Sequence, residues 1–413
     1  MADILHNSTN DTLIALGIAK KHHDALIQLP SGKTISVRIT NTLEGYQRLL
    51  SLAKVEPSRI IVGFEPTSDY HRNIAYWLSQ QGVNCHLVSS LSCARTREML
   101  YNTWDKNDRK DSKVILYLLA SGLSKPFYEP LIASTMDIQE ISNTYHQITI
   151  ARTRCLNSLV NHYLTLYFPE AEQFLHASRA EWFCQFLLKF PTPLAITRYK
   201  QQTFVKRAWD IIGRKQYKQQ FLEHLYDIAR ESIALPVSVA SHSVETFKLQ
   251  LRRYIELSQQ RVDLEKKSEL FLAERADYQR LRTLPGVGPI IALMIIAESG
   301  DLNRFKHYRQ YLAYCGFSLS SVQSGQRQSN FKLSKRGNAR LRYAYWLAAT
   351  NAIRQRENSF RHKYERYIRL NGSDSDNKRK VYTTVATKLA RVAHAVVKKN
   401  VDYRGYFEVS HGT

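Results

Sequence analysis

The stretch that decides the fold is LIALGIAKKHHDALIQLPSGKTISVRI, residues 13–39. It contains an apolar run at Leu13–Ala19, a shorter one at Ala25–Gln28, and apolar–polar alternation over Lys33–Ile39. Apolar runs of this length, separated by turn residues such as Gly32, are typical of β-strands. The stretch therefore predicts three neighbouring strands joined by tight turns.

Helices and strands are predicted to alternate after this point. The predicted helices cover 43–53, 70–80 and 111–120, and the predicted strands cover 59–64 and 84–88. The resulting order, βββαβαβα, is that of an RNase H-like (RuvC-like) α/β nuclease domain with a mixed sheet, here over residues 1–125. Many other α/β domains share similar element orders, so the order alone does not establish a nuclease.

Three carboxylates in this region are candidate metal ligands. Glu65 directly follows the strand 59–64, where open α/β sheets present their ligands. Asp108 and Asp111 stand three residues apart at a helix start and so share a face. Converging carboxylates hold two Mg²⁺ or Mn²⁺ ions about 3.5–4 Å apart in enzymes that cleave phosphodiesters. The alternative is that the aspartates stabilise a helix N-terminus and that Glu65 is a surface turn residue.

The charge is strongly positive and unevenly distributed. Over 413 residues, 59 Lys and Arg face 36 Asp and Glu, which gives a net charge of +23. Residues 301–413 hold 23 Lys and Arg against 7 Asp and Glu, so +16 of the excess lies there. A polyanion bound mainly by the C-terminal part explains this asymmetry better than a basic surface kept for solubility. The length itself favours two or three domains.

The middle of the chain, residues 126–278, is predicted to be helical. Val244, Phe247, Leu251 and Tyr254 follow the spacing of a short coiled coil or helical hairpin, although a helical-bundle core gives the same pattern. Aromatic residues are frequent over 170–240, and we interpret them as core rather than as base-stacking side chains: Trp182, Phe183, Phe186, Phe190, Tyr199, Phe204 and Trp209.

The C-terminal part, residues 279–413, is predicted to be mainly helical. It opens with LPGVGP at 284–289, followed by an apolar helix. A helix-hairpin-helix-like turn of this kind brings the backbone N–H groups of Gly286 and Gly288 near a phosphate. A tight turn between two buried helices is the equal alternative. The tail, 361–404, is predicted to be a basic helix pair broken at 371–374.

Two blocks of the chain, about 12–122 and 278–356, resemble the IS110/IS116/IS902 family of insertion-sequence transposases. In the first block, FEPTSDY at 64–70 and NDRKDS at 107–112 are similar to the family segments E-x-T-x-x-Y and T-D-x-x-D-A. In the second, the similarity is nearly residue for residue at Pro285-Gly286-Val287-Gly288-Pro289, Gly300-Asp301, Arg304-Phe305, Gly316, Ser324-Gly325, Ser334-Lys335-Arg336-Gly337-Asn338 and Leu341-Arg342.

This resemblance implies a serine nucleophile. Six serines lie from Ser318 to Ser334, in or just after a loop predicted to be exposed over 317–332, and composition does not distinguish one of them. The family's catalytic serine precedes a glycine in this loop, and Ser324-Gly325 is its one Ser-Gly pair. Ser324 would form a phosphoserine link, with Glu65, Asp108 and Asp111 as the metal-binding acids. Basic residues near it would hold the nucleic-acid backbone: Arg327, Lys335, Arg336, Arg340 and Arg342.

The resemblance further implies a DNA transposase or site-specific recombinase. Its partners would be donor and target DNA, a structured noncoding guide RNA, and further copies of the chain in a dimer or tetramer assembled through a coiled-coil-like insertion. Two other interpretations remain open. One is a catalytically inactive nucleic-acid-binding derivative, and the other is a Holliday-junction-type nuclease that uses the carboxylates alone.

One position departs from the family pattern. The family's first strand is similar to A-L-D-I-A-K-K, whereas this chain has ALGIAKK at 15–21, with Gly17 in place of the first metal-binding aspartate. Glycine inside a strand costs stability, so folding gives no reason for it. We expect weaker metal binding and impaired cleavage. Asp24, on the next predicted strand, is the nearest substitute.

The remaining composition indicates a protein of a reducing compartment. Five scattered cysteines form no CxxC pair, no apolar run reaches membrane-spanning length, and the N-terminus has no basic segment followed by an apolar one. We therefore expect a cytoplasmic, nucleoid-associated bacterial protein without a membrane partner.

Overall fold

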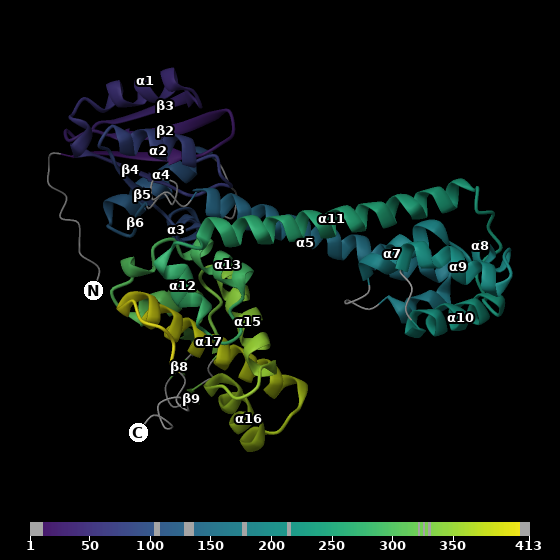
Figure 1. Cartoon of the computed structure of the whole chain (residues 1–413). Coiled ribbons are helices and arrows are strands. Elements are labelled where there is room, and N and C mark those ends of the chain that lie inside the picture. The colour runs from purple at the N-terminus through teal and green to yellow at the C-terminus, as the bar shows by residue number, and fades with distance from the viewer. Residues whose placement is uncertain are drawn as a thin grey trace. The chain divides into compact units, whose positions relative to one another are not determined.

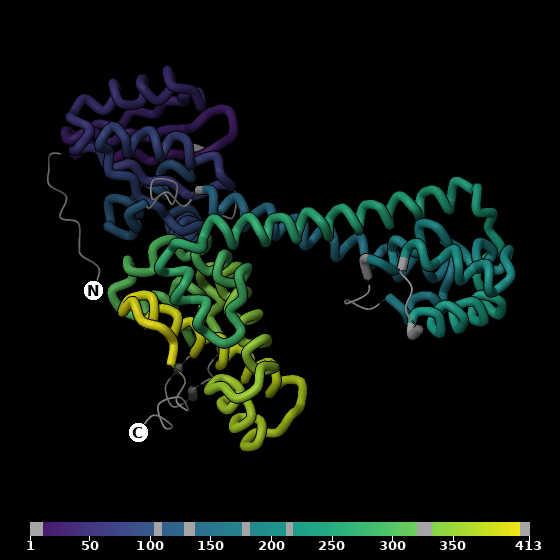
Figure 2. Tube along the Cα trace, viewed as in Figure 1, coloured from purple at the N-terminus to yellow at the C-terminus, as the bar shows by residue number. Residues whose placement is uncertain are grey.

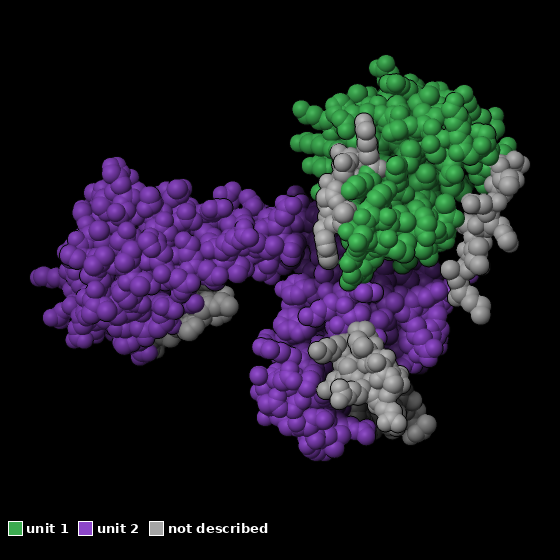
Figure 3. All heavy atoms as spheres, turned by 180° about the vertical axis from the view of Figure 1, so that it is seen from behind, with its two compact units in different colours: residues 1–133 green, residues 134–413 purple. Residues whose placement is uncertain are grey.

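The computed structural model of the chain describes residues 11–102, 108–127, 136–175, 180–212, 216–320, 323–324, 327–328 and 332–404. It divides into two compact units, Met1–Ala133 and Ser134–Thr413 (Figure 3). The first unit extends the predicted domain 1–125 by a few residues. The predicted boundary between 278 and 279 lies inside the second unit, so a division there remains a prediction.

The first unit is a mixed sheet with helices on both faces (Figure 1). The strand order is β3-β2-β1-β4-β5-β6, with β4 parallel to both β1 and β5 and the other pairs antiparallel. Its elements are β1 Thr12–Gly17, β2 His22–Gln28, β3 Thr34–Thr40, α1 Leu43–Ala53, β4 Ile60–Phe64, α2 Arg72–Gln80, β5 Asn84–Leu87, α3 Ser90–Tyr101, α4 Asp108–Ala120 and β6 Lys125–Pro126. All predicted strands and helices of this region are confirmed, whereas α3 and β6 were missed.

Strand β1 lies at the centre because its side chains are apolar on both faces. Ile14 and Leu16 belong to a core with residues of α1 and α2, and Ala15 belongs to a core with residues of α3 and α4. Successive residues of a strand point to opposite faces, so one apolar run supplies both cores. On β4, Gly63 lets α4 approach closely, because a Cβ there would lie 3.1 Å from Leu119.

The second unit begins with a long helix, α5 Met136–Ser158, which packs beside the 31-residue α11, His242–Leu272 (Figures 1 and 2). The chain between these two helices forms shorter helices: α6 Thr165–Tyr167, α7 Ala180–Lys189, α8 Pro193–Thr197, α9 Gln201–Ile212 and α10 Gln216–Arg230. Phe183, Phe186, Phe190 and Phe204 are fully buried in their core, which confirms the core interpretation of the aromatic residues. Phe247, Leu251 and Tyr254 of α11 join the same core, so a helical-bundle core within the chain accounts for their spacing.

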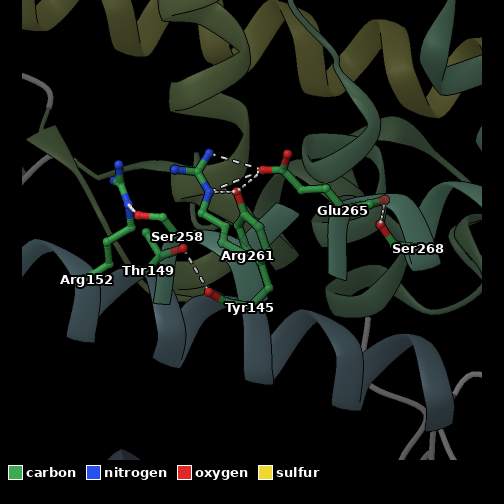
Figure 4. Close-up of polar contacts among 7 residues, drawn as sticks. All are labelled: Tyr145, Thr149, Arg152, Ser258, Arg261, Glu265 and Ser268. Atoms are coloured by element: carbon green, nitrogen blue, oxygen red, sulfur yellow. Dashed lines mark hydrogen bonds and ion pairs between the residues drawn. The ribbon is translucent and has the colours of Figure 1, made fainter. Parts of the chain in front are cut away.

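Polar contacts also connect α5 and α11, as Figure 4 shows. The Tyr145 hydroxyl donates to Glu265 Oε1 at 2.8 Å and accepts from Arg261 Nε at 2.7 Å. Two turns further along α5, Arg152 Nε donates to Ser258 Oγ at 2.8 Å. Burial and the hydrogen bond to Glu265 raise the pKa of Tyr145 to about 12, so the phenol stays protonated and donates to the carboxylate throughout the physiological pH range.

The C-terminal part of this unit is a helical cluster around α13, α15 and α17. Its elements are α12 Ala276–Arg282, α13 Pro289–Ser299, α14 Tyr308–Tyr314, β7 Leu319–Ser320, β8 Gln323–Ser324, β9 Arg327–Gln328, β10 Lys332–Leu333, α15 Ala339–Arg354, α16 Ser359–Asn371 and α17 Ser375–Lys399. The predicted break at 371–374 is confirmed. The prediction of an exposed loop from Phe317 onward is wrong at its start, because the Phe317 side chain is buried against Tyr345.

All five cysteines, one or more from each part of the fold, are free thiols with buried side chains. Within the described residues, every helix is too short or too polar to cross a lipid bilayer.

The turn between α12 and α13 makes a close approach to α15. Gly286 has a φ of 81°, and a Cβ there would lie 2.2 Å from the Ala348 carbonyl oxygen. We therefore expect Gly286→Ala to lower the free energy of unfolding by roughly 3–5 kcal/mol, from left-handed backbone strain and overpacking. Gly82→Ala is the matched control, because its φ is 79° and a Cβ there would have no neighbouring atom within 4 Å. It should cost only about 1–2 kcal/mol in urea denaturation. Equal losses in the two variants would show that the contact with α15 is unimportant.

Candidate active site

The ends of two adjacent parallel strands define the candidate site in the first unit. Leu16 of β1 is the register partner of Phe64 of β4. Gly17, which ends β1, and Glu65, which follows β4, are therefore neighbours at the same edge of the sheet. This is the edge where open α/β sheets place their functional groups.

The first turn of α4 lies against this edge. A Cβ on Gly17 would lie 3.5 Å from the Ser112 hydroxyl oxygen and 3.5 Å from the Asp24 carbonyl oxygen. The preceding residue, Asp111, is buried, with 8% of its surface exposed. Asp108 is the first residue of α4, and its side chain lies outside the described residues. Glu65, Asp111 and position 17 thus lie on neighbouring elements at this edge of the sheet, and their use as one catalytic site remains a prediction.

Two further residues of the site come from α3, which the sequence did not predict. Arg97 Nε and Nη2 lie 2.8 Å and 2.5 Å from Asp111 Oδ1. Burial raises the pKa of the Cys93 thiol to about 12, and the charge and hydrogen bonding of Glu65 and the charge of Asp111 add to the rise. Cys93, Arg97, Glu65 and Asp111 therefore make up one group, with Cys93 and Asp111 buried and Glu65 and Arg97 partly buried, which we call the acidic site.

These residues fit a two-ion metal site only in part. The carboxylate oxygens of Glu65 and Asp111 are suitable ligands for Mg²⁺ or Mn²⁺. However, Gly17 offers no ligand, and Arg97 already neutralises Asp111. Among the side chains that the structure describes, no three potential ligands gather in one place. Asp24 lies next to position 17, with its Cβ 3.8 Å from a Cβ built on Gly17, and both of its carboxylate oxygens accept from Arg38, at 2.8 and 2.9 Å. Its use as a substitute ligand therefore requires release from Arg38 and remains a prediction.

We expect the pair of Arg97 and Asp111 to be important for stability. Its side chains are only 12% and 10% exposed, so Arg97→Ala would leave a buried charge without its partner. The expected loss is roughly 3–5 kcal/mol in the free energy of unfolding. Arg95→Ala, on the same helix, is the control, because its pair with Glu98 is at the surface and should matter by less than about 1 kcal/mol. Urea denaturation of both variants tests this, and equal, small losses would contradict it.

The predicted nucleophile lies in the second unit. The backbone of Ser324 belongs to β8, where it pairs with Arg327 of β9. The side chains of Ser324 and Arg327 lie outside the described residues. Their assigned functions therefore remain predictions.

The predicted phosphate-binding cations after this loop differ in their surroundings. Lys335 and Arg336 have exposed side chains. Arg340 instead pairs with Glu298 at 3.0 Å, and Arg342 donates to the Lys335 carbonyl at 3.2 Å. Arg340 and Arg342 thus help to hold this segment in place, which sequence could not show because their partners lie on other elements or on the backbone.

The LPGVGP turn borders an open cavity of about 700 Å³. The Gly286 N–H donates to Gln355 Oε1 at 3.1 Å, so a phosphate would have to displace this side chain to reach it. Gly288 is the N-cap of α13 and has no side-chain cap. Arg282 and Arg354 also line the cavity. Contact between this turn and a phosphate remains a prediction.

Two family models match the chain. One, described as "Transposase IS116/IS110/IS902 family", matches residues 278–365, which include the LPGVGP turn, the Ser324 region and the cations that follow it. The other, described as "Transposase" and modelling a DEDD domain of IS110 elements, matches residues 14–169, which include the acidic site. DEDD transposase domains generally use divalent metal ions.

Curated relatives agree with these matches. The insertion element IS116 uncharacterized 44.8 kDa protein of Streptomyces clavuligerus is 24% identical over 360 residues, which are 84% of this chain and 86% of the relative. The transposase for insertion sequence element IS1111A of Coxiella burnetii is 35% identical over 80 residues, 19% of this chain and 22% of the relative. The chain belongs to the IS110/IS116/IS902 family of transposases, enzymes that cut and rejoin DNA.

Proposed function

We propose that this transposase cuts and rejoins DNA through Ser324, as a site-specific recombinase of an IS110-type insertion sequence. The observation that supports this best is the position of Ser324-Gly325 inside the segment matched by the family model, ten residues before Ser334-Lys335-Arg336-Gly337-Asn338. In the family this serine is the nucleophile, and no other Ser-Gly pair occurs in the loop 317–332.

The proposed step is a transfer of a phosphodiester from DNA to protein. The Ser324 hydroxyl oxygen attacks the phosphorus, so an Oγ–P bond forms and the bond from phosphorus to one sugar oxygen breaks. The serine proton passes to solvent, and the departing sugar oxygen takes up a proton to become a hydroxyl. The phosphoserine keeps the energy of the broken bond, so a hydroxyl of the new DNA partner can reverse the step and reseal the strand.

The surrounding residues have to stabilise charge on the phosphate. The exposed side chains of Lys335 and Arg336 supply cations close in sequence to the nucleophile, and each would contact the backbone rather than read bases. A divalent ion, when bound by Glu65, Asp108 and Asp111, would supply the Lewis-acid chemistry for activating the serine. Gly17 weakens that site, so we propose that activity of this chain is impaired.

The acidic site also supports a second candidate function. Gly17 lacks a ligand, and the ion pair with Arg97 satisfies Asp111 without a metal. A DNA-binding derivative without catalytic activity would have these properties. A Holliday-junction-type nuclease, by contrast, needs the carboxylates to be complete and is disfavoured by the same observations.

We also propose three partners: donor and target DNA, a structured noncoding RNA that selects them by base pairing, and further copies of the chain in a dimer or tetramer. Purifying the protein after expression with its native flanking DNA, and sequencing any RNA retained, tests the RNA partner. Light scattering of the same sample gives the number of chains. Recovery of RNA without any preferred sequence would contradict a guide.

The test of the function is a covalent protein–DNA adduct. The full chain, its noncoding RNA and a plasmid with the element ends should give an SDS-stable adduct that nuclease digestion reduces to a phosphoserine at Ser324. Tight DNA binding with no adduct, even when Gly17 is replaced by aspartate, would favour the inactive derivative.

A further inference from the structure

Three cations from two helices gather on one face of the C-terminal helical cluster. Lys363 belongs to α16, and Lys388 and Arg391 belong to α17. Two open cavities of about 490 Å³ and 450 Å³ adjoin here, and both are lined by Lys363 and Lys388. We call the two cavities together the cationic groove.

These cations lack acidic partners among the described residues. Lys388 Nζ lies 5.4 Å from the centre of the Phe360 ring, and the Arg391 guanidinium lies 4.5 Å from that of Tyr308. Burial and the charges of Lys388 and Arg391 lower the pKa of Lys363, and burial lowers that of Lys388. The nearest acid along α16, Glu365, pairs with Arg361. The groove therefore holds repelling positive charges that a bound anion would relieve.

The walls of the groove narrow the choice of anion. Both cavities have mostly apolar walls beside the cations. The apolar wall includes Tyr308, Leu312, Phe317, Leu319 and Leu333. The second cavity adds polar and cationic side chains, namely Ser359, His362, Arg366 and Asn371. An apolar surface next to cations suits a base and its phosphate together. A duplex hides its base faces in the stack, so only an unpaired strand presents both.

The groove also lies at the base of the segment that contains Ser324. Leu319 belongs to β7 and Leu333 to β10, and these strands pair antiparallel, with Leu319 opposite Leu333. They immediately precede and follow the Ser324 region in the chain. A strand held in the groove would therefore be anchored beside the segment proposed to cut it.

We propose that the cationic groove binds an unpaired nucleic-acid strand, with Lys363, Lys388 and Arg391 on its phosphates and a base against the apolar wall. This inference rests on the proposed function for its choice of ligand. It deepens that function by giving the unpaired strand a binding site distinct from the acidic site and from Lys335 and Arg336.

The test compares two charge-matched double variants of the full chain. The first, Lys363→Gln with Lys388→Gln, removes two groove cations. The control, Lys378→Gln with Arg379→Gln, removes two exposed cations at the start of α17 that line neither cavity. Fluorescence anisotropy is measured with a labelled oligothymidylate, with the matching oligouridylate and with a DNA hairpin duplex, over a series of salt concentrations.

The groove variant should bind both single strands about tenfold more weakly. The slope of the logarithm of the binding constant against the logarithm of the salt concentration should be smaller in magnitude by roughly 1.4, the value for two lost phosphate contacts. The control should change by less than about threefold, and the duplex should be little affected in either variant. Comparison of the affinities for oligothymidylate and oligouridylate shows whether the groove prefers DNA or RNA. Unchanged melting temperatures confirm that both variants are folded.

The inference would be overturned if the groove variant and the control lost the same affinity for single strands, or if the groove variant lost as much affinity for the duplex as for single strands. Undiminished single-strand binding by the groove variant would overturn it as well. The outcome is separable from the proposed function. Groove-dependent strand binding by a chain that keeps Ser324 and carries Gly17→Asp, yet forms no covalent adduct, would contradict the catalytic proposal alone. Normal adduct formation by a groove variant with undiminished strand binding would contradict this inference alone.

Discussion

Replacing Gly17 by aspartate is expected to raise Mg²⁺-dependent strand cleavage by about a hundredfold, because a completed metal site stabilises the transition state by about 3 kcal/mol. The fold has room for the new side chain. A Cβ at position 17 would find its nearest neighbours at 3.5 Å, an ordinary contact distance, and the position is not among the glycines with positive φ. The new carboxylate would lie beside Glu65 and the first turn of α4.

Gly17→Asn is the matched control, because it has nearly the same size and shape but no charge. Cleavage of a plasmid with the element ends is measured with Mg²⁺ and with EDTA, and Mg²⁺ affinity is measured separately by calorimetry. Aspartate should tighten Mg²⁺ binding and raise cleavage, whereas asparagine should do neither. If Mg²⁺ binds more tightly but cleavage does not rise, the acidic site is not the catalytic centre. If neither changes, the account of Gly17 as a lost ligand is wrong.

Ser324→Ala, made together with Gly17→Asp, is expected to abolish the covalent adduct and to lower strand rejoining by roughly 10⁴-fold or more, the usual cost of losing a serine nucleophile. Ser329→Ala, in the same loop, is the control and should leave the adduct intact. Gel electrophoresis of end-labelled DNA under denaturing conditions measures the adduct and the rejoined product together. DNA binding at equilibrium should be the same in both variants.

The result for Ser324→Ala also separates the other enzyme class. Nicking that persists at full rate without Ser324 would show that the carboxylates act alone, as in a Holliday-junction-type nuclease. Loss of adduct in Ser329→Ala instead would move the nucleophile to that serine. Both results would contradict the proposed step, although they would leave family membership unchanged.

The elements of the first unit were predictable because their signals are local. The continuous apolar run at 13–19 indicates a strand that is buried on both faces, and the alternation at 33–39 indicates a strand that is buried on one face. The sheet contains one strand of each kind, β1 and β3. The placement of Glu65 and Asp111 was likewise predictable, because a residue that follows a parallel strand and one in the first turn of a covering helix lie at the same edge of the sheet. Their role as metal ligands remains a prediction.

The rest depended on contacts that sequence spacing does not encode. Helix α3 has the sequence SLSCARTREMLY, whose few apolar residues form no continuous stripe, so neither the helix nor its Arg97 was predicted. The acceptors of Arg340 and Arg342 are 42 and 7 residues away in the chain, at Glu298 and at the Lys335 carbonyl. Lys363 and Lys388 meet only because α16 and α17 pack side by side.

Enclosed thiols make this chain convenient for labelling. Since Cys85, Cys93, Cys155, Cys184 and Cys315 are all buried, and burial raises the pKa of Cys85 to about 11, maleimide reagents have no ready target on the folded protein. A single cysteine introduced at an exposed position such as Lys378 would then accept one fluorophore or spin label without removal of any native residue. Pairs of such labels would follow the transposase in real time as it captures and releases its DNA.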